Sequence, residues 1–318
     1  MENGLPRISV IIPCYNAALY IAATIESVLA QTLPAAEILV VDDGSQDNSL
    51  AVLAGFGERV RILTRENGGP AAARNLAIAN ATGDFIAFLD SDDLWEPEKL
   101  ARQMAEFSAH PETGLVFSEA IMFREENGER AALQRIGYTG DPTFRQLLFG
   151  DYIPNSTVIV RREAIESTGP LNESRELVGA EDYEYWMRIA LRHQLRGIPA
   201  SLAWYRIRPG NLMGAGEDIE KGLRLAQLAL EAVEAREQSI WPSIWPSFWP
   251  SFWEAHGVDR AQLFARLHLR AGHAWRLRGA WRQWLGHNLA ALAHCRQPQT
   301  TPRILRWMIA AAVLRRWS

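Results

Sequence analysis

Phe85-Ile86-Ala87-Phe88-Leu89 runs directly into Asp90-Ser91-Asp92-Asp93, and this stretch decides the fold. An apolar run without polar alternation is typical of a parallel strand that is buried on both faces. Three carboxylates within four residues repel one another unless protons or a cation neutralise them, and their oxygens suit Mg²⁺ or Mn²⁺. The stretch therefore predicts a buried strand with a cation site at its carboxyl end. A helix cap followed by solvated turn residues is the alternative.

Similar apolar runs alternate with amphipathic stretches on both sides of this strand, as in a sheet with crossover helices. Strands are expected at 8–12, 38–41, 60–63, 85–89 and 115–118. Helices are expected at 18–31, 49–56, 70–80 and 97–110, with Pro70 and Pro97 as first-turn prolines. The pattern predicts an α/β fold whose central sheet is mostly parallel and flanked by helices. Such sheets bind ligands beyond the carboxyl ends of their strands.

The pattern loosens after residue 120. We expect a polar loop as far as Asp141, a strand at 157–160, a helix from Glu181 and a strand at 202–207. The predicted organisation is an α/β domain over 1–215 with halves meeting near 120, a helix at 216–238, a linker at 239–254 and a helical extension at 255–318. The linker repeats Ser-Ile/Phe-Trp-Pro, and a proline at every fourth position breaks a helix.

Composition excludes several classes of protein. The 318 residues are 48% hydrophobic and 22% charged, as in ordinary globular chains, which excludes wholesale disorder and collagen. Cys14 and Cys295 show no disulfide or zinc-type spacing. No signal peptide and no apolar run of about 20 residues are present. We therefore expect a cytoplasmic protein.

Two further motifs follow expected strands. Asp42-Asp43-Gly44-Ser45 places carboxylates where they could accept hydrogen bonds from a nucleobase or ribose, and an Asx turn is the alternative. Pro13-Cys14-Tyr15-Asn16 offers the Tyr15 ring for stacking and the Asn16 amide for capping or base contact, or else is a plain helix entry.

Asn67-Gly68-Gly69-Pro70 precedes a predicted helix that carries Arg74 in its second turn. Flexible backbone and a guanidinium near a helix N-terminus favour a phosphate or another anion. A glycine turn with Arg74 as a surface charge is the alternative.

Glu181-Asp182 begins a later helix. Asp182, Tyr185, Trp186 and Ile189 follow the i, i+3, i+4, i+7 spacing, so we expect Asp182 at the top of the buried face. Glu181 is expected to stabilise the helix start.

These pieces in this order resemble the inverting glycosyltransferase family 2 over roughly residues 7 to 210. The resemblance implies a GT-A (Rossmann-like) fold. It also implies an enzyme that transfers a sugar from a nucleotide-diphosphate donor to an acceptor hydroxyl with inversion of the anomeric configuration, and a UDP-sugar is favoured over a GDP- or TDP-sugar. It implies that Asp182 is the catalytic base and that Mn²⁺ or Mg²⁺ is bound by Asp92, Asp90 and Asp93. With the anion-binding motif included, the expected donor-binding residues are Pro13, Tyr15, Asn16, Asp43, Gly68, Arg74, Asp90 and Arg208.

One departure and two competing functions remain. Arg208 stands near a position where many members carry His, and because arginine cannot bind a cation, a third protein ligand for the metal is in doubt. A sugar nucleotidyltransferase is one alternative, although its glycine-rich basic loop is absent after the first strand. A non-catalytic protein that binds nucleotide sugars or carbohydrate is the other.

The end of the chain is basic. Residues 255–318 hold eleven Arg, no Lys and one acid, Asp259, interleaved with Trp. Such a segment suits an amphipathic surface on anionic lipid at the cytoplasmic face of the membrane, and a helical accessory subdomain is the alternative. No nucleic-acid module accompanies the charge. A glycan or lipid-linked acceptor in cell-envelope synthesis agrees with the family resemblance.

Overall fold

The computed structural model describes most of the first two thirds of the chain. The described residues are 6–126, 129–137, 140–147, 153–208, 227–228, 231–232 and 235–236. All but the last three pairs belong to one compact unit formed by Met1–Leu147 and Asp151–Leu212. The predicted linker at 239–254 and extension at 255–318, and most of the predicted helix at 216–238, lie outside the described residues. The domain boundary near residue 215 stays a prediction.

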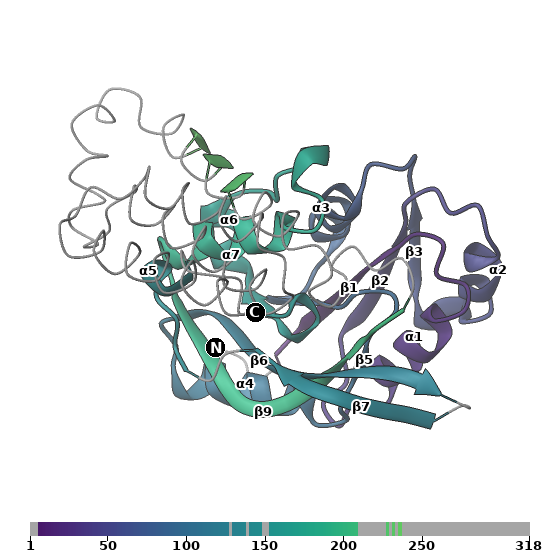
Figure 1. Cartoon of the computed structure of the whole chain (residues 1–318), viewed down its shortest axis with the longest axis horizontal. Coiled ribbons are helices and arrows are strands. Elements are labelled where there is room, and N and C mark those ends of the chain that lie inside the picture. The colour runs from purple at the N-terminus through teal and green to yellow at the C-terminus, as the bar shows by residue number, and fades with distance from the viewer. Residues whose placement is uncertain are drawn as a thin grey trace, which may run out of the picture. The chain divides into compact units, whose positions relative to one another are not determined.

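The centre of this unit is a nine-stranded sheet (Figure 1). Its strand order is β3-β2-β1-β4-β8-β6-β9-β5, with β7 paired to β6. The strands are β1 (Ile8–Cys14), β2 (Glu37–Asp42), β3 (Arg61–Thr64), β4 (Phe85–Phe88), β5 (Leu94–Trp95), β6 (Thr113–Glu126), β7 (Glu129–Ile136), β8 (Ile159–Arg161) and β9 (Gln194–Arg206).

Helices connect and cover the strands. The α-helices are α1 (Ile21–Leu29), α2 (Ser49–Ala54), α3 (Pro70–Asn80), α4 (Lys99–Ala109), α5 (Phe144–Leu147), α6 (Arg162–Thr168) and α7 (Glu181–Ala190). Short 3₁₀ turns are η1 (Gly57–Arg59), η2 (Asn155–Thr157) and η3 (Arg175–Leu177). The predicted α/β fold is confirmed.

Strands β1 to β4 are all parallel, as expected. β1 lies between β2 and β4, with Cys14 beside Asp42 and Ile11 beside Phe88. Apart from the half-buried Pro13, all residues of β1 are buried, as is the whole of β4, which is why neither strand alternates with polar residues. The free thiol of Cys14 is also buried, and burial raises its pKa to about 12.

The later strands form a mixed sheet. β8 is antiparallel to β4 and β6, whereas β9 is parallel to β6 and antiparallel to the short β5. β9 is a long, strongly bent strand (Figure 1). Its pairing with β6 shifts register near Glu119, where the irregularity bends the strand. The bend carries the end of β9, with Arg206, to the acidic turn that follows β4.

The expectation of a loop between residue 120 and Asp141 is wrong. Most of this stretch continues β6 and forms β7, and the two strands pair as an antiparallel hairpin. Most side chains of β7 are exposed, and this strand pairs with β6 at the edge of the sheet. An edge strand that buries neither face has no apolar alternation, so its sequence resembles a loop.

Two smaller expectations are also corrected. Pro97 is not in the first turn of a helix, because α4 begins at Lys99 after an N-cap at Glu98, whereas Pro70 does occupy the start of α3. The two-residue strand β5 was not expected. Within the described part of the chain, no helix has both the length and the apolar character needed to cross a bilayer.

Candidate functional site

The carboxyl ends of β1, β2 and β4 bring three of the sequence motifs together. The backbone N–H of Asn16 donates to Ser45 Oγ at 3.0 Å, and Asn16 Oδ1 accepts from the N–H of Gln46 at 2.8 Å. Asn16 is the non-glycine residue with a positive φ in the described chain, at 49°, a conformation that asparagine tolerates well. The predicted donor-binding turns after β1 and β2 are therefore joined, and the Asn16 amide holds the second turn.

Asp43 holds the glycine turn before α3. Its side chain is 3% exposed, and its two oxygens accept hydrogen bonds from the N–H groups of Gly68 at 2.9 Å and Gly69 at 2.7 Å. Arg65 Nε lies 3.2 Å from the same carboxylate. Asp43 and Gly68, both expected to bind the donor, thus bind each other.

Tyr15 and Pro13 line the same edge of the sheet. Tyr15 is 46% exposed, although its ring is large and apolar. Pro13 is half-buried beside it. An exposed ring next to the paired turns fits the expected stacking surface for a base.

Arg74, Asp90 and Glu181 form a group that we call the buried ion cluster. Arg74 is 4% exposed, and its guanidinium donates to Glu181 Oε1 at 2.7 Å and to Asp90 Oδ1 at 2.8 Å. Asn155 Nδ2 donates to the same Asp90 oxygen at 2.8 Å. The cluster joins α3, the end of β4 and the start of α7.

Charges within the cluster shift the ionisation of its members. Burial acts to lower the pKa of Arg74, but the carboxylates of Asp90 and Glu181 raise it above its usual value. Burial and the neighbouring charges of Asp92 and Glu181 raise the pKa of Asp90, and Arg74 opposes this rise. Arg74 therefore serves as an internal counter-ion for carboxylates. An exposed position, the alternative for Arg74, is wrong.

The expected orientation of the α7 acids is reversed. Glu181 is buried and Asp182 is half-buried, so the residue at the top of the buried face is Glu181. Glu181 Oε2 also accepts from the N–H of Gly179 at 2.6 Å. Asp182 lies at the N-terminal end of α7, close enough to Arg74 that its charge raises the pKa of Arg74.

Asp92 and Arg208 form an ion pair that we call the rim pair. Arg208 Nε donates to Asp92 Oδ2 at 2.6 Å, and the two side chains are 27% and 14% exposed, respectively. Burial acts to lower the pKa of Arg208, and its bond to Asp92 raises it. Two of the residues predicted from the sequence are thus in direct contact.

The Asp93 carboxylate is buried and hydrogen-bonded inside the protein. It is 1% exposed, its Oδ1 accepts from the N–H of Arg206 at 2.9 Å, and its Oδ2 accepts from Ser156 Oγ at 2.6 Å. Burial and the charges of Asp92 and Asp90 raise its pKa well above the usual value. Because Asp93 is buried and each of its oxygens already accepts a hydrogen bond, it fits a metal ligand less well than Asp92 or Asp90.

The three aspartates do not continue the strand. The N–H of Asp93 bonds to the carbonyl of Asp90 at 3.2 Å, so the backbone turns after β4. Asp90 and Asp92 therefore do not lie on one face of an extended strand. Each of the three carboxylates has a different arginine as its neighbour: Arg74, Arg208 and Arg206.

Asp92 and Asp90 do fit a divalent cation. Each is partly exposed and keeps one oxygen, Oδ1 of Asp92 and Oδ2 of Asp90, without a hydrogen bond from another described residue. Across the described ranges, no three carboxylate, imidazole or thiol side chains gather as a metal site. Mg²⁺ usually keeps several waters and takes one or two carboxylates plus substrate phosphates, so two partly exposed aspartates are sufficient.

Comparison with known proteins adds the family. The model of the family "Glycosyl transferase family 2" matches residues 9–169, from the first strand through α6. The chain belongs to glycosyltransferase family 2. The matched range contains the paired turns, the aspartates after β4 and Arg74, while Asp182 and Arg208 lie beyond it.

Relatives of this family 2 glycosyltransferase support the assignment. An uncharacterized glycosyltransferase of Nostoc sp. is 33% identical over 213 residues, which cover 64% of this chain and 66% of that protein. The hyaluronan synthase of Pasteurella multocida is 33% identical over 191 residues, 59% of this chain and 19% of that enzyme. The chain thus spans less than two thirds of the length of either relative.

A solved structure shares the fold. S. aureus TarS 1-349, crystallised in complex with UDP-GlcNAc, superposes with a TM-score of 0.56 at 19% identity, covering 91% of this chain and 90% of that one. The GT-A fold expected from the sequence is confirmed.

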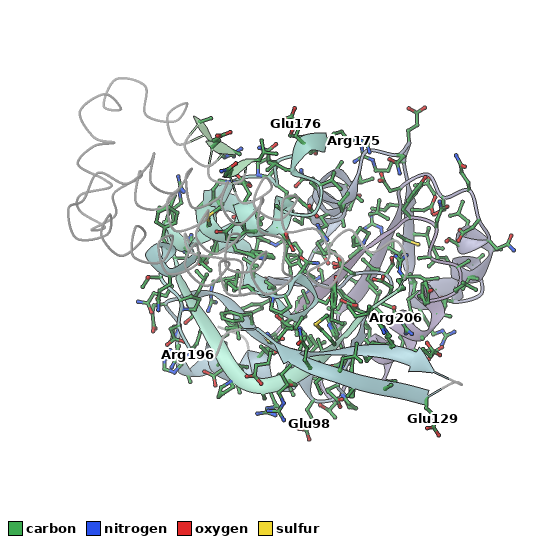
Figure 2. All side chains as sticks on the ribbon, viewed as in Figure 1. Glu98, Glu129, Arg175, Glu176, Arg196 and Arg206 are labelled. Atoms are coloured by element: carbon green, nitrogen blue, oxygen red, sulfur yellow. The ribbon has the colours of Figure 1, made fainter. Side chains whose placement is uncertain are left out.

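Several residues of the site were not predicted. Glu181, Asn155 and Ser156 bond to Asp90, Asp93 or Arg74, and Tyr20 and Arg206 lie against Arg208 and Asp92. Arg206 is buried among other side chains, whereas Glu176 projects outward (Figure 2). The adjacent acids of Glu181-Asp182 were a usable signal for Glu181, but Tyr20 and Asn155 stand in no recognisable pattern.

Proposed function

We propose that this family 2 glycosyltransferase is an inverting enzyme. It transfers a sugar from a UDP-sugar to a hydroxyl of a glycan or lipid-linked acceptor in cell-envelope polysaccharide or glycoconjugate synthesis. The observation that carries the proposal is the placement of Asp182 beside the buried ion cluster, with the rim pair two residues along the same turn after β4. The name of one relative, a hyaluronan synthase, supports a role in polysaccharide synthesis. The UDP-GlcNAc complex of TarS supports UDP as the nucleotide of the donor.

The residues divide the work of holding the donor. The Tyr15 ring stacks on the base beside the turns that Asn16 and Asp43 hold together. Arg208 pairs with the diphosphate, for which a planar guanidinium is well suited. Asp92, with Asp90 beside it, would hold Mn²⁺ or Mg²⁺, which supplies positive charge to the departing diphosphate when bound.

Asp182 takes the proton of the acceptor. As the acceptor oxygen bonds to the anomeric carbon, the bond from that carbon to the diphosphate breaks, and the hydroxyl proton passes to an Asp182 carboxylate oxygen. Attack from the face opposite the leaving group inverts the anomeric configuration. The N-terminal end of α7 stabilises the negative charge that Asp182 needs as a base.

Donor class is tested by thermal unfolding with UDP-, GDP- and TDP-sugars, each with and without Mn²⁺. A donor at about 100 times its dissociation constant adds about 2.7 kcal/mol to the free energy of unfolding, which gives a clear rise in Tm. We expect the rise with a UDP-sugar. A rise with GDP- or TDP-sugars alone would replace the proposed donor, and no rise with any nucleotide sugar would contradict the function.

Asp182→Asn tests the base. We expect kcat to fall about 10²- to 10⁴-fold with donor binding retained, because Asn keeps the shape but cannot accept the proton. Glu176→Gln, at an exposed acid of η3, is the matched control and should leave kcat unchanged. Retained turnover in the Asn variant would remove Asp182 from this role. The anomeric configuration of the product, measured by NMR, tests inversion.

Peripheral membrane contact through residues 255–318 is a separate part of the proposal and rests on their Arg- and Trp-rich sequence. Flotation with anionic liposomes, with and without these residues, measures it. Equal flotation of the two chains would contradict membrane contact.

A further inference from the structure

Arg208 and a divalent cation would share one small carboxylate. Arg208 Nε bonds to Asp92 Oδ2, and the other oxygen of this carboxylate, Oδ1, is bonded to the same carbon. A cation at Asp92 Oδ1 would therefore lie close to a guanidinium. Like charges at such a distance, in a side chain that is 14% exposed, repel strongly.

Arg208 is more exposed to solvent than its neighbour Arg206. Arg206 is 4% exposed, donates to the carbonyl of Asp92 at 2.8 Å, pairs with Glu125 and stacks over the Phe123 ring at 4.6 Å. Arg208 is 27% exposed and follows the end of β9. Of the two arginines at this turn, Arg208 is the one placed to change partner.

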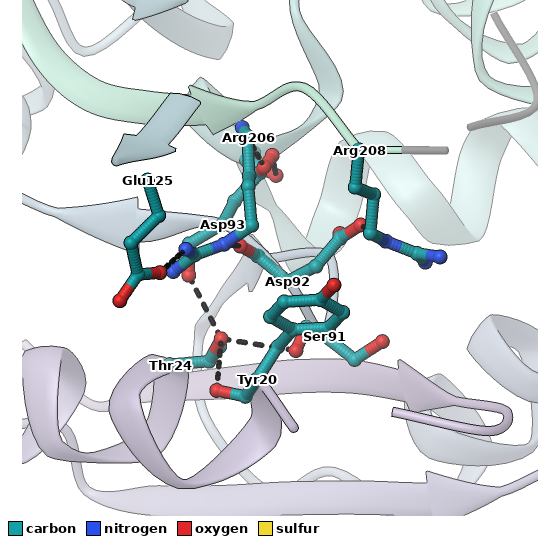
Figure 3. Close-up of polar contacts among 9 residues, drawn as sticks. Tyr20, Thr24, Ser91, Asp92, Asp93, Glu125, Arg206 and Arg208 are labelled. Carbon is teal, nitrogen blue, oxygen red and sulfur yellow. Dashed lines mark hydrogen bonds and ion pairs between the residues drawn. The ribbon is translucent and has the colours of Figure 1, made fainter. Parts of the chain in front are cut away.

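Tyr20 gives Arg208 a surface on which to move. The Tyr20 ring centroid lies 5.2 Å from the Arg208 guanidinium carbon and 5.0 Å from that of Arg206. Figure 3 shows the ring beside Asp92 with both arginines around that aspartate. The attraction of a cation to a ring face depends weakly on rotation about it, so Arg208 can turn while it stays on the ring.

We propose that Arg208 is an exchangeable counter-ion: it neutralises Asp92 until the donor arrives, then moves to the diphosphate and opens Asp92 to the divalent cation. Tyr20 is the positioning residue for this exchange. The inference rests on the proposed function, since it requires a nucleoside diphosphate at the rim pair.

Charge balance explains the order. Asp92 and Arg208 together are neutral, so a cation at Asp92 Oδ1 would have to share that carboxylate with the guanidinium. A diphosphate supplies at least two negative charges and accepts the guanidinium in a bidentate pair, which leaves the Asp92 carboxylate to the cation. Nucleotide and cation therefore increase each other's affinity, and by linkage the two increases are equal.

The test measures Mn²⁺ binding by electron paramagnetic resonance, with UDP as the nucleotide and no sugar to transfer. In the natural chain we expect UDP to tighten Mn²⁺ binding by about 5- to 150-fold. Arg208→Gln should bind Mn²⁺ more tightly than the natural chain when UDP is absent, and UDP should add much less. Arg196→Gln, on β9 and paired with Glu106 away from this turn, is the control and should behave as the natural chain.

Three further variants keep the test informative if Arg208→Gln folds poorly. Arg208→Lys keeps the charge without the planar guanidinium. In the absence of UDP, its Mn²⁺ affinity should therefore stay below that of Arg208→Gln. Tyr20→Leu should raise Mn²⁺ affinity without UDP and weaken UDP binding, and Tyr20→Phe, which keeps the ring, should restore both.

The outcomes separate this inference from the function it rests on. If UDP fails to bind the natural chain, the proposed function fails. If UDP binds but Arg208→Gln leaves Mn²⁺ affinity without UDP unchanged or lower, the counter-ion exchange is wrong and the function stands. Absence of Mn²⁺ binding in the presence of UDP would likewise overturn the exchange.

Discussion

The buried ion cluster and the rim pair lie two residues apart on one turn, yet they are built for different tasks. Arg74 is 4% exposed and touches two carboxylates on different elements, Asp90 and Glu181. Arg208 is 27% exposed and pairs with the single carboxylate of Asp92. The two pairs differ in burial: the first ties three elements together, and the second, more exposed to solvent, is the one for which we propose exchange with a ligand.

The largest expected effect comes from breaking the cluster. Arg74→Met leaves Asp90 and Glu181 without their counter-ion, and an uncompensated buried charge costs about 3–5 kcal/mol. Urea denaturation followed by circular dichroism measures this loss in the free energy of unfolding. Arg196→Met, at a partly exposed pair, is the control and should lose far less. Equal losses in the free energy of unfolding of the two variants would show that burial does not determine how much an ion pair stabilises this protein.

Asp93 sharpens the comparison because its carboxylate is buried without a guanidinium bond. Asp93→Ala removes the acceptor for the Arg206 N–H and the Ser156 hydroxyl, and we expect a loss of about 1–3 kcal/mol. Asp93→Asn keeps the shape and one acceptor and should lose less. Neither variant should change Mn²⁺ affinity in the presence of UDP by more than a few-fold, whereas Asp92→Asn should abolish the binding. Loss of Mn²⁺ from Asp93→Asn would restore Asp93 as a ligand.

Lys99 extends the comparison to a buried amine whose described neighbours include no carboxylate partner. It is fully buried, stacks on the Trp95 ring at 4.1 Å and donates to Gln103 Oε1 at 2.6 Å, and burial lowers its pKa well below 10.5. The unfolded chain therefore binds a proton that the folded chain does not, so stability rises with pH up to the unfolded value. The slope approaches about 1.4 kcal/mol per pH unit for one proton.

Lys99→Met tests this slope. Relative to the variant, the free energy of unfolding of the natural chain should rise as the pH increases toward 10.5 and level off above it. Arg102→Met, at an exposed position on the same helix, should leave the slope unchanged. Parallel pH profiles for Lys99→Met and the natural chain would mean that Lys99 is charged inside the protein.

The smallest effect on stability is expected at the rim pair. Arg208→Ala should lower the free energy of unfolding by about 1 kcal/mol or less, because a partly exposed pair gains little over hydration. The difference should shrink in 1 M salt, where charges are screened within about 3 Å. A loss as large as that of Arg74→Met would contradict an exchangeable role for Arg208.

The sequence predicted the elements that bury a face or begin at a strong signal. The helix starting at Pro70 and the helix starting at Glu181 both begin at the expected residue. The hairpin of β6 and β7 was not predicted because β7 is exposed on both faces. Local pattern identifies an element only when burial differs between its faces.

The same limit explains the error at Asp182. Spacing along α7 placed Asp182 on the buried face, but the helix is buried nearly all round, with Glu184 and Arg188 paired inside it. Apolar periodicity cannot select one face of such a helix. The choice of Glu181 depends on Arg74, which is far away in the sequence, so only the folded chain shows it.

The reactivity of the Cys14 thiol can be used to measure how often the core of the sheet opens. Its thiol lies at the end of the central strand β1, and a pKa of about 12 keeps it protonated and slow to alkylate while the strand is in place. In a Cys295→Ser variant, the rate of iodoacetamide labelling at Cys14 therefore times the opening of β1. Cys14 thus reports the opening of the parallel part of the sheet without an added dye.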